Sequence, residues 1–375
     1  MTKIKVAHVL HSVGGVDVSL RLILQNIDSS KFESIVVHGK NDTKSLFFNQ
    51  KNNPIRSYST TIVRNISLIK DFRAFYDTYK ILKREQPQII HTHSAKGGII
   101  GRLIAKMLDI PVLHTPQAFS YLCTQNPLKK QLFLLIERCF TIGKIKLLAS
   151  SHSELQRGLN EVGFKKEKTL LFNNAINKII IDKPLCISKT WPDEYICTVG
   201  RPSYQKNIEL MIDILKAVRV SIDIHLIIMG VGFHSDHLKY VKTKIVQYDL
   251  EKNVTLLPWT ERQDVFNIIS KSKLYISTAR YEGLPYSIIE ALALSKPCIV
   301  TDCDGNRDLI KEGYNGYIIN NESINTFSTK ISELLTNKQK HKKFSHHAYK
   351  SFIDFYNMED NIVHLEYIYQ SEAGL

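Results

Sequence analysis

Residues 282–290 read EGLPYSIIE, and they join a predicted strand, Leu274–Ser277, to a predicted helix, Tyr286–Leu294. Gly283 lets the backbone approach a ligand closely, because it has no side chain. Pro285 suits the start of a helix, where its missing amide hydrogen is not needed. The amide groups at a helix start favour an anion such as a diphosphate. This strand–turn–helix pattern therefore predicts one unit of an α/β fold with an anion site beside it.

The two glutamates that frame this stretch, Glu282 and Glu290, are candidate ligands of a sugar nucleotide. Glu282 precedes the helix and could accept hydrogen bonds from sugar hydroxyls. Glu290 lies about a turn and a half along the helix, where a ribose could meet it. The plainer interpretation is that Glu282 caps the helix and Glu290 lies on a solvated face. For two isolated glutamates that interpretation would be favoured, but a second segment argues against it.

That second segment, residues 200–207, reads GRPSYQKN and follows another predicted strand, Tyr195–Val199. It places the guanidinium of Arg201 and the ammonium of Lys206 at the carboxyl end of this strand. Paired cations there can neutralise a leaving diphosphate without a metal ion, which is the main electrostatic requirement of sugar transfer. Alone on a loop, an arginine and a lysine would be ordinary solvated charges. Together with the two glutamates, they predict a sugar-diphosphate site.

The rest of the chain alternates strand and helix in the same way. In the first half, strands are predicted at Ile4–Leu10, Ser34–His38, Gln88–His91 and Val112–His114, and helices at Val18–Ile27, Phe72–Gln86 and Gly97–Leu108. A stretch with two prolines and little periodicity, Asp182–Asp193, predicts a linker, after which the alternation restarts. We therefore predict two α/β domains with doubly wound parallel sheets, which bind ligands at the carboxyl ends of the strands, in the cleft between the domains.

Several protein classes are disfavoured by composition. The chain of 375 residues has no run close to the roughly 18–20 apolar residues of a membrane span, and it begins with strand-like residues in place of an apolar signal core. Its six cysteines are scattered, as in proteins with reduced thiols. The pairs His91/His93 and His346/His347 have no second cluster to complete a metal site, so we expect no metal. These features predict a cytoplasmic enzyme.

With these motifs in place, the chain resembles the family-4 glycosyltransferases, which have the two-domain GT-B architecture. It matches the family's E-x7-E motif, its G-R…K-N loop and, at Gly14-Gly15-Val16, its amino-terminal glycine turn. Asn174–Asn177, reading NAIN, stands where the family often has N-G-I-D. The resemblance covers nearly the whole chain. It implies an acceptor domain at 1–182, a donor domain at 183–345 and carboxyl-terminal helices at 346–375 that cross back to the first domain.

The resemblance also implies a role for each motif residue. Glu282 would hold the donor sugar and Glu290 the ribose, while Arg201 and Lys206 would bind the phosphates. The remaining implied donor-site residues are the backbone of Gly283 and Leu284 with Pro285 at the helix start, the closing turn Gly14-Gly15, and Pro258-Trp259 beside the base. The family transfers with retention and generally needs no metal, so no cofactor is expected beyond the nucleotide-sugar co-substrate.

Two further segments, residues 91–98 (HTHSAKGG) and 114–121 (HTPQAFSY), resemble stretches of members that build bacterial surface polysaccharides. They make His93 and Gln117 candidates to face the sugar or the acceptor. Those relatives usually carry a histidine where Gln117 stands. A neutral amide can hydrogen-bond a sugar hydroxyl but cannot take a proton at neutral pH. This departure fits a front-face mechanism in which the leaving phosphate takes the acceptor's proton.

The net charge of +14 is concentrated in the first half. Residues 1–185 hold 28 Lys and Arg against 13 Asp and Glu, a net charge of +15, whereas 186–375 are nearly neutral at −1. Residues 128–140 mix lysines with large apolar side chains, which suits either a helix packed on the sheet or one lying on an anionic membrane surface. Nucleic acid would also satisfy the charge, but no recognition module appears. We expect a peripheral protein at the inner face of the membrane, with a polyprenyl-diphosphate-linked glycan as acceptor.

The predicted reaction is retaining transfer of a hexosyl or N-acetylhexosaminyl group from a UDP- or GDP-sugar to a glycan hydroxyl, in the synthesis of capsule, O-antigen or exopolysaccharide. Three alternatives stay open. A glycan phosphorylase would need a longer chain and a cofactor lysine. A sugar-nucleotide epimerase shares the GT-B shape, but the paired glutamates and cations count against it. A donor-binding subunit without activity is suggested only by Gln117.

Overall fold

The computed structural model describes residues 3–63, 67–232, 235–320 and 323–374. The chain divides into two compact units. The first contains Met1–Asn177 and Asn357–Leu375, and the second Lys178–Tyr356. The boundary thus falls at Asn177, ahead of the proline-containing stretch that predicted a linker, and the chain returns to the first unit at Asn357, later than the predicted residue 346.

The first unit is built on a parallel sheet of seven strands in the order β3-β2-β1-β4-β5-β6-β7. The strands are β1 Ile4–Val9, β2 Phe32–Gly39, β3 Ser57–Thr60, β4 Ile89–His93, β5 Val112–Thr115, β6 Ile145–Ala149 and β7 Thr169–Leu171. The chain moves outward from β1 in one direction and then, from β4, in the other. The carboxyl ends of β1 and β4 therefore form the point of this sheet where ligands bind in doubly wound folds.

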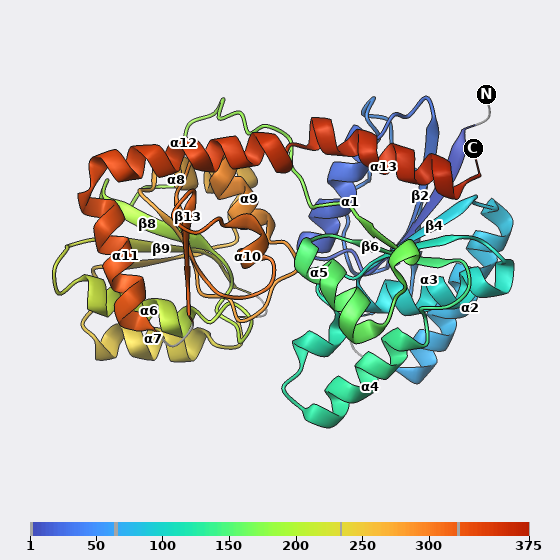
Figure 1. Ribbon diagram of the computed structural model, residues 1–375, viewed down its shortest axis with the longest axis horizontal. Helices are drawn as coiled ribbons and strands as arrows, with labels where there is room; N and C mark the ends of the chain where they lie inside the picture. Colours follow the sequence, from blue (N-terminus) through green and yellow to red (C-terminus); the bar gives the residue numbers. More distant parts are fainter. Residues whose placement is uncertain (1–2, 64–66, 233–234, 321–322, 375) are drawn as a thin grey trace. The chain divides into compact units, whose positions relative to one another are not determined.

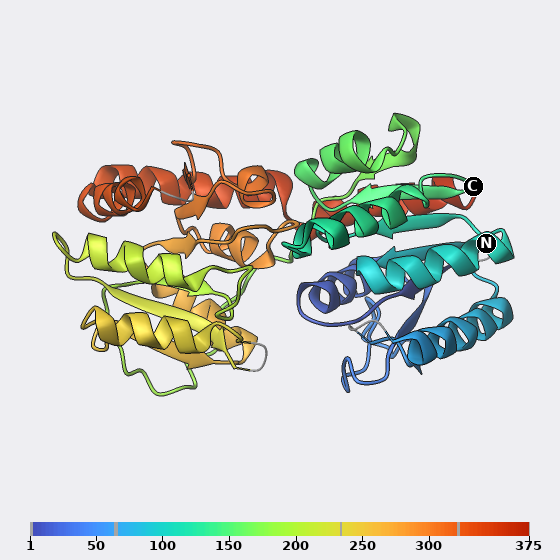
Figure 2. The ribbon, with the colours of Figure 1, turned by 90° about the horizontal axis from the view of Figure 1, so that it is seen from below.

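Helices cover both faces of this sheet (Figure 1). They are α1 Gly15–Asn26, α2 Leu68–Glu85, α3 Ser94–Leu108, α4 Pro127–Arg138, α5 His152–Arg157 and α13 Met358–Glu372. Apolar residues of α2 and α3 pack with β1, β2 and β4 in one core, whereas those of α1 and α13 pack on the opposite face of β1 and β4. Figure 2 shows α2 and α3 side by side. The amphipathic helices thus bury their apolar sides against strands that are buried on both faces.

The second unit repeats the design with six parallel strands in the order β10-β9-β8-β11-β12-β13. These are β8 Tyr195–Val199, β9 His225–Val231, β10 Val254–Pro258, β11 Tyr275–Ser277, β12 Cys298–Thr301 and β13 Gly316–Ile319. The helices are α6 Ile208–Val218, α7 Leu238–Gln247, α8 Arg262–Lys271, α9 Tyr286–Ala293, α10 Asn306–Leu309, α11 Ile324–Thr336 and α12 Lys338–Phe355. Its switch point lies between β8 and β11, the strands that precede the two segments singled out in the sequence.

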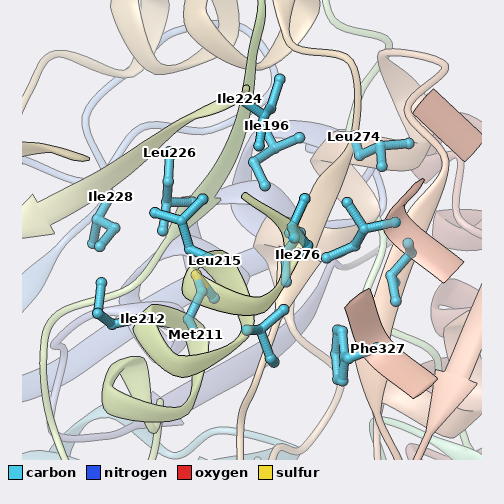
Figure 3. Packing of buried hydrophobic residues seen from close by; sticks show 14 of the residues in the cluster. Ile196, Met211, Ile212, Leu215, Ile224, Leu226, Ile228, Leu274, Ile276 and Phe327 are labelled. Atoms are coloured by element: carbon cyan, nitrogen blue, oxygen red, sulfur yellow. The ribbon is translucent and has the colours of Figure 1, made fainter. Parts of the chain in front are cut away.

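An aliphatic core holds the second unit together (Figure 3). Ile196 of β8 and Leu226 of β9 are fully or almost fully buried, and they pack in one cluster with Met211 and Leu215 of α6 and Phe327 of α11. The β-branched and leucine side chains of the strands fill the space between sheet and helices, as expected for a parallel sheet. This packing gives the loops at the carboxyl edge of the sheet a rigid base.

The two carboxyl-terminal helices belong to different units. Phe344 of α12 is buried in the core of the second unit, and α12 packs against α9. By contrast, Met358, Leu365 and Tyr369 of α13 are buried against the first sheet. The prediction that residues 346–375 return to the first domain was therefore wrong for the part of this segment that lies in α12. An amphipathic helix can pack on either sheet, so its sequence pattern does not say which one it covers. No helix in the described ranges has the length and apolar character needed to cross a membrane.

Candidate functional site

The loops that follow β8 and β11 meet at the switch point of the second sheet. The backbone amide of Arg280 donates to the carbonyl oxygen of Gln205 at 2.8 Å. The hydroxyl of Thr278 lies 2.9 Å from the carbonyl oxygen of Asn207. Neighbouring parallel strands end at the same edge of a sheet, and these bonds join their loops there. The segments 200–207 and 282–290 therefore lie beside one another and form one candidate site.

Lys206 and Glu282 form the centre of this structure. The Nζ atom of Lys206 lies 2.6 Å from Oε1 of Glu282, and Nε2 of Gln205 donates to Oε2 at 3.2 Å. Glu282 is buried, and Lys206 is half-buried. The alternative that Glu282 merely caps α9 is not what the structure shows, because both carboxylate oxygens are held by the loop after β8. This loop fixes the direction in which the carboxylate can act on a ligand.

Arg201 contributes a second cation from the same loop. It is half-buried and, in the described part of the chain, its guanidinium takes part in no hydrogen bond or ion pair. It therefore differs from Lys206, whose charge is balanced by Glu282. An uncompensated guanidinium at the carboxyl end of a central strand attracts anions and can bind phosphate in a bidentate manner.

The turn at residues 283–285 is supported from a neighbouring strand. A Cβ atom at Gly305, which has a φ of +76°, would lie 2.5 Å from the carbonyl oxygen of Gly283. Next to it, the side-chain amide of Asn306 donates to the carbonyl oxygen of Thr301 at 3.1 Å. Sequence reasoning missed Gly305, although a glycine between β12 and a helix could have signalled it. Pro285 lies one residue before α9, at its N-cap, and not in its first turn.

Glu290 lies in the middle of α9 and is buried beside Arg262, the first residue of α8. The Nη2 atom of Arg262 lies 2.5 Å from Oε1 of Glu290. Burial raises the pKa of Glu290, and the nearby guanidinium opposes this shift. The expected solvated position of Glu290 in the plainer interpretation was thus wrong. The sequence did not predict the pairing of Arg262 with Glu290, because the two residues lie on different helices and their separation along the chain follows no motif.

Replacement of Glu290 by Gln should not destabilise the protein at neutral pH. The pKa of Glu290 is raised in the folded state, because burial favours its protonated form. The stability gained by the protonated carboxyl is fully present below the unfolded-state pKa and is lost as the pH rises through the folded-state value. The amide carries no charge to desolvate. Thermal unfolding of both proteins should therefore give an equal or higher Tm for Glu290→Gln at pH 7, and this advantage should disappear in acid. A lower Tm at pH 7 would contradict the assigned burial.

The other predicted residue pair of the second unit lies further along the sheet edge. Pro258 ends β10, and Trp259 is 67% exposed. The indole ring lies against the end of β9, where a Cβ atom at Gly232 would be 3.1 Å from Cδ1 of Trp259. The pair therefore sits at the carboxyl edge, two strands from β8. No described contact joins it to Glu282 or Lys206.

In the first unit, the predicted glycine turn follows β1. Gly14 has a φ of +62° and forms the N-cap of α1, which begins at Gly15. A side chain at Gly14 would meet no atom within 4 Å, so the turn faces open space, and the positive φ is what favours glycine there. The turn is exposed at the switch point between β1 and β4. This position suits contact with a ligand.

His93 does not face the surface as the sequence suggested. Its side chain is completely buried at the end of β4, and its Nε2 atom lies 3.1 Å from Nδ1 of His8. Burial lowers the pKa of His8, His91 and His93, so all three rings are neutral at pH 7. His8 of β1 pairs in register with His91 of β4, and the three rings therefore meet in the core. The spacing of His91 and His93 in the sequence could not predict that His8 joins them.

The three rings bring one nitrogen each to within 4.8 Å of one another, a spacing that could hold a metal ion. However, both nitrogens of His91 already have partners. The Thr115 hydroxyl donates to the carbonyl oxygen of Leu148 and so accepts a bond from Nε2–H of His91 at 2.9 Å. The Tyr369 hydroxyl then donates to Nδ1 at 2.7 Å. This network connects α13 to β4 and occupies both nitrogens of His91.

Gln117 follows β5 at the carboxyl edge of the first sheet. Its φ is +52°, and that of Ala118 is +77°. Two successive non-glycine residues in this region carry a cost of about 1–2 kcal/mol each. The Nε2 atom of Gln117 is also buried without a hydrogen-bond partner among the described residues. Strained backbone and an unsatisfied donor together are typical of a ligand-binding position.

Known proteins with similar sequences are glycosyltransferases. Residues 13–178 match the family described as Glycosyltransferase Family 4, and residues 188–351 match Glycosyl transferases group 1. A galactosyltransferase of Escherichia coli, named for transfer from UDP-Gal to α-D-GlcNAc-diphosphoundecaprenol, is 28% identical over 90% of this chain and 89% of its own.

Solved structures show the same fold. Sucrose-phosphate synthase from Thermosynechococcus elongatus superposes with a TM-score of 0.81 at 15% identity, over 98% of this chain and 99% of that one. HepE from Anabaena, solved with UDP and glucose, gives a TM-score of 0.78 at 15% identity, over 98% and 100%. Two Rossmann-like domains with these neighbours define the GT-B fold. The two family matches together span most of the chain, which belongs to the family-4 glycosyltransferases.

Proposed function

We propose that this enzyme transfers a sugar, with retention of configuration and without a metal ion, from a UDP- or GDP-sugar to a hydroxyl of a lipid-linked glycan. The observation that carries the proposal is the grouping of Arg201, Lys206 and Glu282 at the switch point of the second sheet. The reaction transfers negative charge to the departing diphosphate. Fixed cations aimed at that charge lower the barrier.

The two cations have different tasks. The guanidinium of Arg201 has no partner among the described residues and can bind the diphosphate before reaction. Lys206 is held by Glu282 through a 2.6 Å contact, which keeps its ammonium in place on a flexible side chain. When sugar hydroxyls donate to Glu282, the ammonium can shift toward the phosphate. Glu282 therefore grips the sugar and positions Lys206, and it need not act as an acid or base.

The remaining donor contacts follow from the same edge of the sheet. The backbone at Gly283 and Leu284 meets the junction of sugar and diphosphate, and Glu290 accepts from ribose hydroxyls. In the first unit, the Nε2 atom of Gln117, which has no hydrogen-bond partner among the described residues, can donate to a ligand. Loss of a hydrogen bond to the charged Glu290 costs about 1.5–3 kcal/mol. We therefore expect Glu290→Gln to weaken donor binding by roughly 10-fold or more.

A lipid-linked acceptor is supported by the name of the Escherichia coli relative, whose acceptor is a diphosphoundecaprenol-linked sugar. Synthesis of a surface polysaccharide is supported by an O-antigen biosynthesis glycosyltransferase of Escherichia coli that is 24% identical over 69% of this chain. We accordingly assign the enzyme to the synthesis of a bacterial surface polysaccharide. The first unit, where the basic residues are concentrated, would bind this acceptor. The acidic lipids of the cytoplasmic leaflet would attract such a unit, and no role in binding nucleic acid is proposed.

Exposed apolar side chains on two helices of the first unit support a membrane-facing surface. At the start of α2, Leu68 and Ile69 are each 85% exposed and Phe72 is 73% exposed. On α4, Phe133 and Leu134 pack on the core. Three leucines of the same helix are exposed: Leu128, Leu132 and Leu135. Basic residues accompany both helices in the sequence, Lys70 and Arg73 on α2, Lys129 and Lys130 on α4. Apolar side chains flanked by cations suit the interface of an anionic bilayer.

Replacement of Leu68 and Phe72 by serine should weaken binding to anionic vesicles by about 10-fold or more, because each side chain contributes roughly 1.5–3 kcal/mol when it leaves water. Vesicle sedimentation with and without phosphatidylglycerol measures the change. The matched control is Val220→Ser, an exposed apolar position of the second unit. Equal binding by the double variant and wild type would contradict the assigned surface.

The proposed activity is tested by incubating the enzyme with a panel of UDP- and GDP-sugars and a diphosphate-linked acceptor, and measuring nucleotide release. We expect release with one donor, dependent on the acceptor. The anomeric configuration of the product tests retention, and activity in the presence of EDTA tests metal independence. Failure to release a nucleotide from any donor would contradict the proposal.

A further inference from the structure

Arg280 contacts the loop of residues 200–207 from the neighbouring strand of the second sheet. It follows β11 and precedes Glu282 by two residues. Its backbone amide donates to the carbonyl oxygen of Gln205 at 2.8 Å, and its Nη1 atom donates to the carbonyl oxygen of Tyr204 at 2.6 Å. Its guanidinium lies over the ring of Tyr204, 4.3 Å from the centroid. One residue thus makes three contacts with two consecutive residues of the loop.

These contacts lie beside the side chains that face Glu282. Gln205 and Lys206 each contact one carboxylate oxygen of Glu282. The main chain of Lys206 is held as well, because the hydroxyl of Thr278 donates to its carbonyl oxygen at 3.0 Å. Thr278, Arg280 and Glu282 therefore hold the loop at every second residue of one segment. The direction of the Lys206 ammonium depends on this segment.

The start of the same loop is held from the other side of β8. In the sheet, β9 is the neighbour of β8 on the side away from β11. After β9, the backbone amide of His237 donates to the carbonyl oxygen of Pro202 at 3.2 Å. The imidazole of His237 also lies near the ring of Tyr204, with the ring centroids 6.4 Å apart. The loop is thus fixed at both flanks, and Arg280 belongs to the flank that also contains Glu282.

The chemistry of an arginine side chain suits this task. In the described part of the chain, the guanidinium of Arg280 forms no ion pair, and the groups it meets are a carbonyl oxygen and an aromatic face. A planar guanidinium can donate in a fixed direction while it stacks on a ring, which a lysine ammonium does less well. Arg280 is half-buried, so its contacts order a loop that is partly exposed. The side chain therefore sets the position of the loop and does not neutralise a buried carboxylate.

We propose that Arg280 is a positioning residue of the donor site, which holds Tyr204 and Gln205 so that the ammonium of Lys206 faces the departing diphosphate. The inference rests on the proposed transfer reaction. Displacement of a catalytic group by about 1 Å can lower the rate by about 100-fold. Since His237 holds the start of the loop, loss of Arg280 displaces the end that carries Lys206. Arg280 therefore acts on the rate through Lys206 and does not itself touch the donor.

The test compares wild type with Arg280→Met, Tyr204→Leu and the double variant in the transfer assay, after circular dichroism has shown which variants are folded. We expect Arg280→Met to lower kcat by about 10–100-fold, with the Kd for the free nucleotide unchanged. Tyr204→Leu removes the ring and keeps the carbonyl oxygen, so it should lower kcat less. Because the two side chains act as one unit, the loss in the double variant should be smaller than the product of the single losses.

Hydrogen–deuterium exchange of the protein without substrate gives a readout that does not depend on activity. The amides of residues 203–207 should exchange faster in Arg280→Met than in wild type, because the loop opens more often without its contacts. Arg219→Met is the matched control, since Arg219 lies at the end of α6 and pairs locally with Asp223. It should keep wild-type kcat and wild-type exchange in residues 203–207.

A kcat within threefold of wild type and unchanged exchange in folded Arg280→Met would overturn the inference, as would full kcat in Tyr204→Leu if the methionine variant does not fold. A rise in the nucleotide Kd that accounts for the loss of rate would also overturn it, because Arg280 would then contact the donor directly. Single losses that multiply in the double variant would contradict action through Tyr204. Absence of transfer by wild type, in contrast, would overturn the proposed function, and the exchange experiment would still test whether Arg280 holds the loop.

Discussion

Arg201→Met is expected to lower kcat by about 10²–10³-fold while leaving the Tm unchanged, because removing one preformed electrostatic contact to a developing charge costs rates of this order. Arg201 is the clean site for this experiment. Among the described residues its guanidinium has no partner, so its removal leaves no buried carboxylate unpaired. Methionine keeps the length of the apolar part of the side chain. Steady-state kinetics with the identified donor measures the effect.

Arg219→Met is the matched control, because Arg219 lies at the end of α6 in the same unit and pairs only locally with Asp223. It should retain wild-type kcat. Lys206→Met should also lower kcat, but with some loss of stability, since Glu282 would then be buried with Gln205 as its one side-chain partner among the described residues. If Arg201→Met transferred sugar within threefold of the wild-type rate, the assigned phosphate site would be wrong.

The largest loss of stability is expected at Arg102, a fully buried residue of α3. Its Nη1 atom lies 2.8 Å from Oε2 of Glu137 on α4, and its Nε atom donates to the carbonyl oxygen of Gly98 at 2.9 Å. Its guanidinium lies over the ring of Phe140, 4.3 Å from the centroid. Breaking a buried ion pair by removing one partner costs about 3–5 kcal/mol, because the other charge stays buried.

Urea unfolding of Arg102→Met should therefore show a free energy of unfolding lower by about 3–5 kcal/mol. Arg138→Met, a change at a more exposed arginine of the same helix pair, should cost less than about 1 kcal/mol. The double variant Arg102→Met with Glu137→Met should recover much of the loss, because no unpaired charge remains. A loss below 1 kcal/mol in the single variant would show that the pair is not buried as described.

The fold could be predicted from local patterns because each strand is a short apolar run and each helix is amphipathic. The functional segments could be predicted for the same reason. Residues 200–207 and 282–290 each follow a strand, and the carboxyl ends of parallel strands share one edge. The contact of Lys206 with Glu282 joins residues 76 apart in the sequence. It could not be predicted from spacing, because it depends on β8 and β11 being neighbours in the sheet.

Other features depend on three-dimensional packing that spacing does not encode. The partner of Glu290 is Arg262, which comes from a separate helix. The resemblance of residues 91–98 predicted that His93 faces the sugar or the acceptor, yet His93 pairs with Thr115 of β5 at the end of β4 and is completely buried. The position of α12 was wrong because its pattern of apolar residues fits either sheet.

The central claim is that the second unit binds the nucleotide diphosphate through Arg201. Isothermal titration of UDP and GDP into wild type, Arg201→Met and Arg219→Met tests it directly. We predict that one of the two nucleotides binds wild type and Arg219→Met equally, and that it binds Arg201→Met about 10–100-fold more weakly, as expected for the loss of a charged hydrogen bond of 1.5–3 kcal/mol. Equal affinity of that nucleotide for all three proteins would contradict the account.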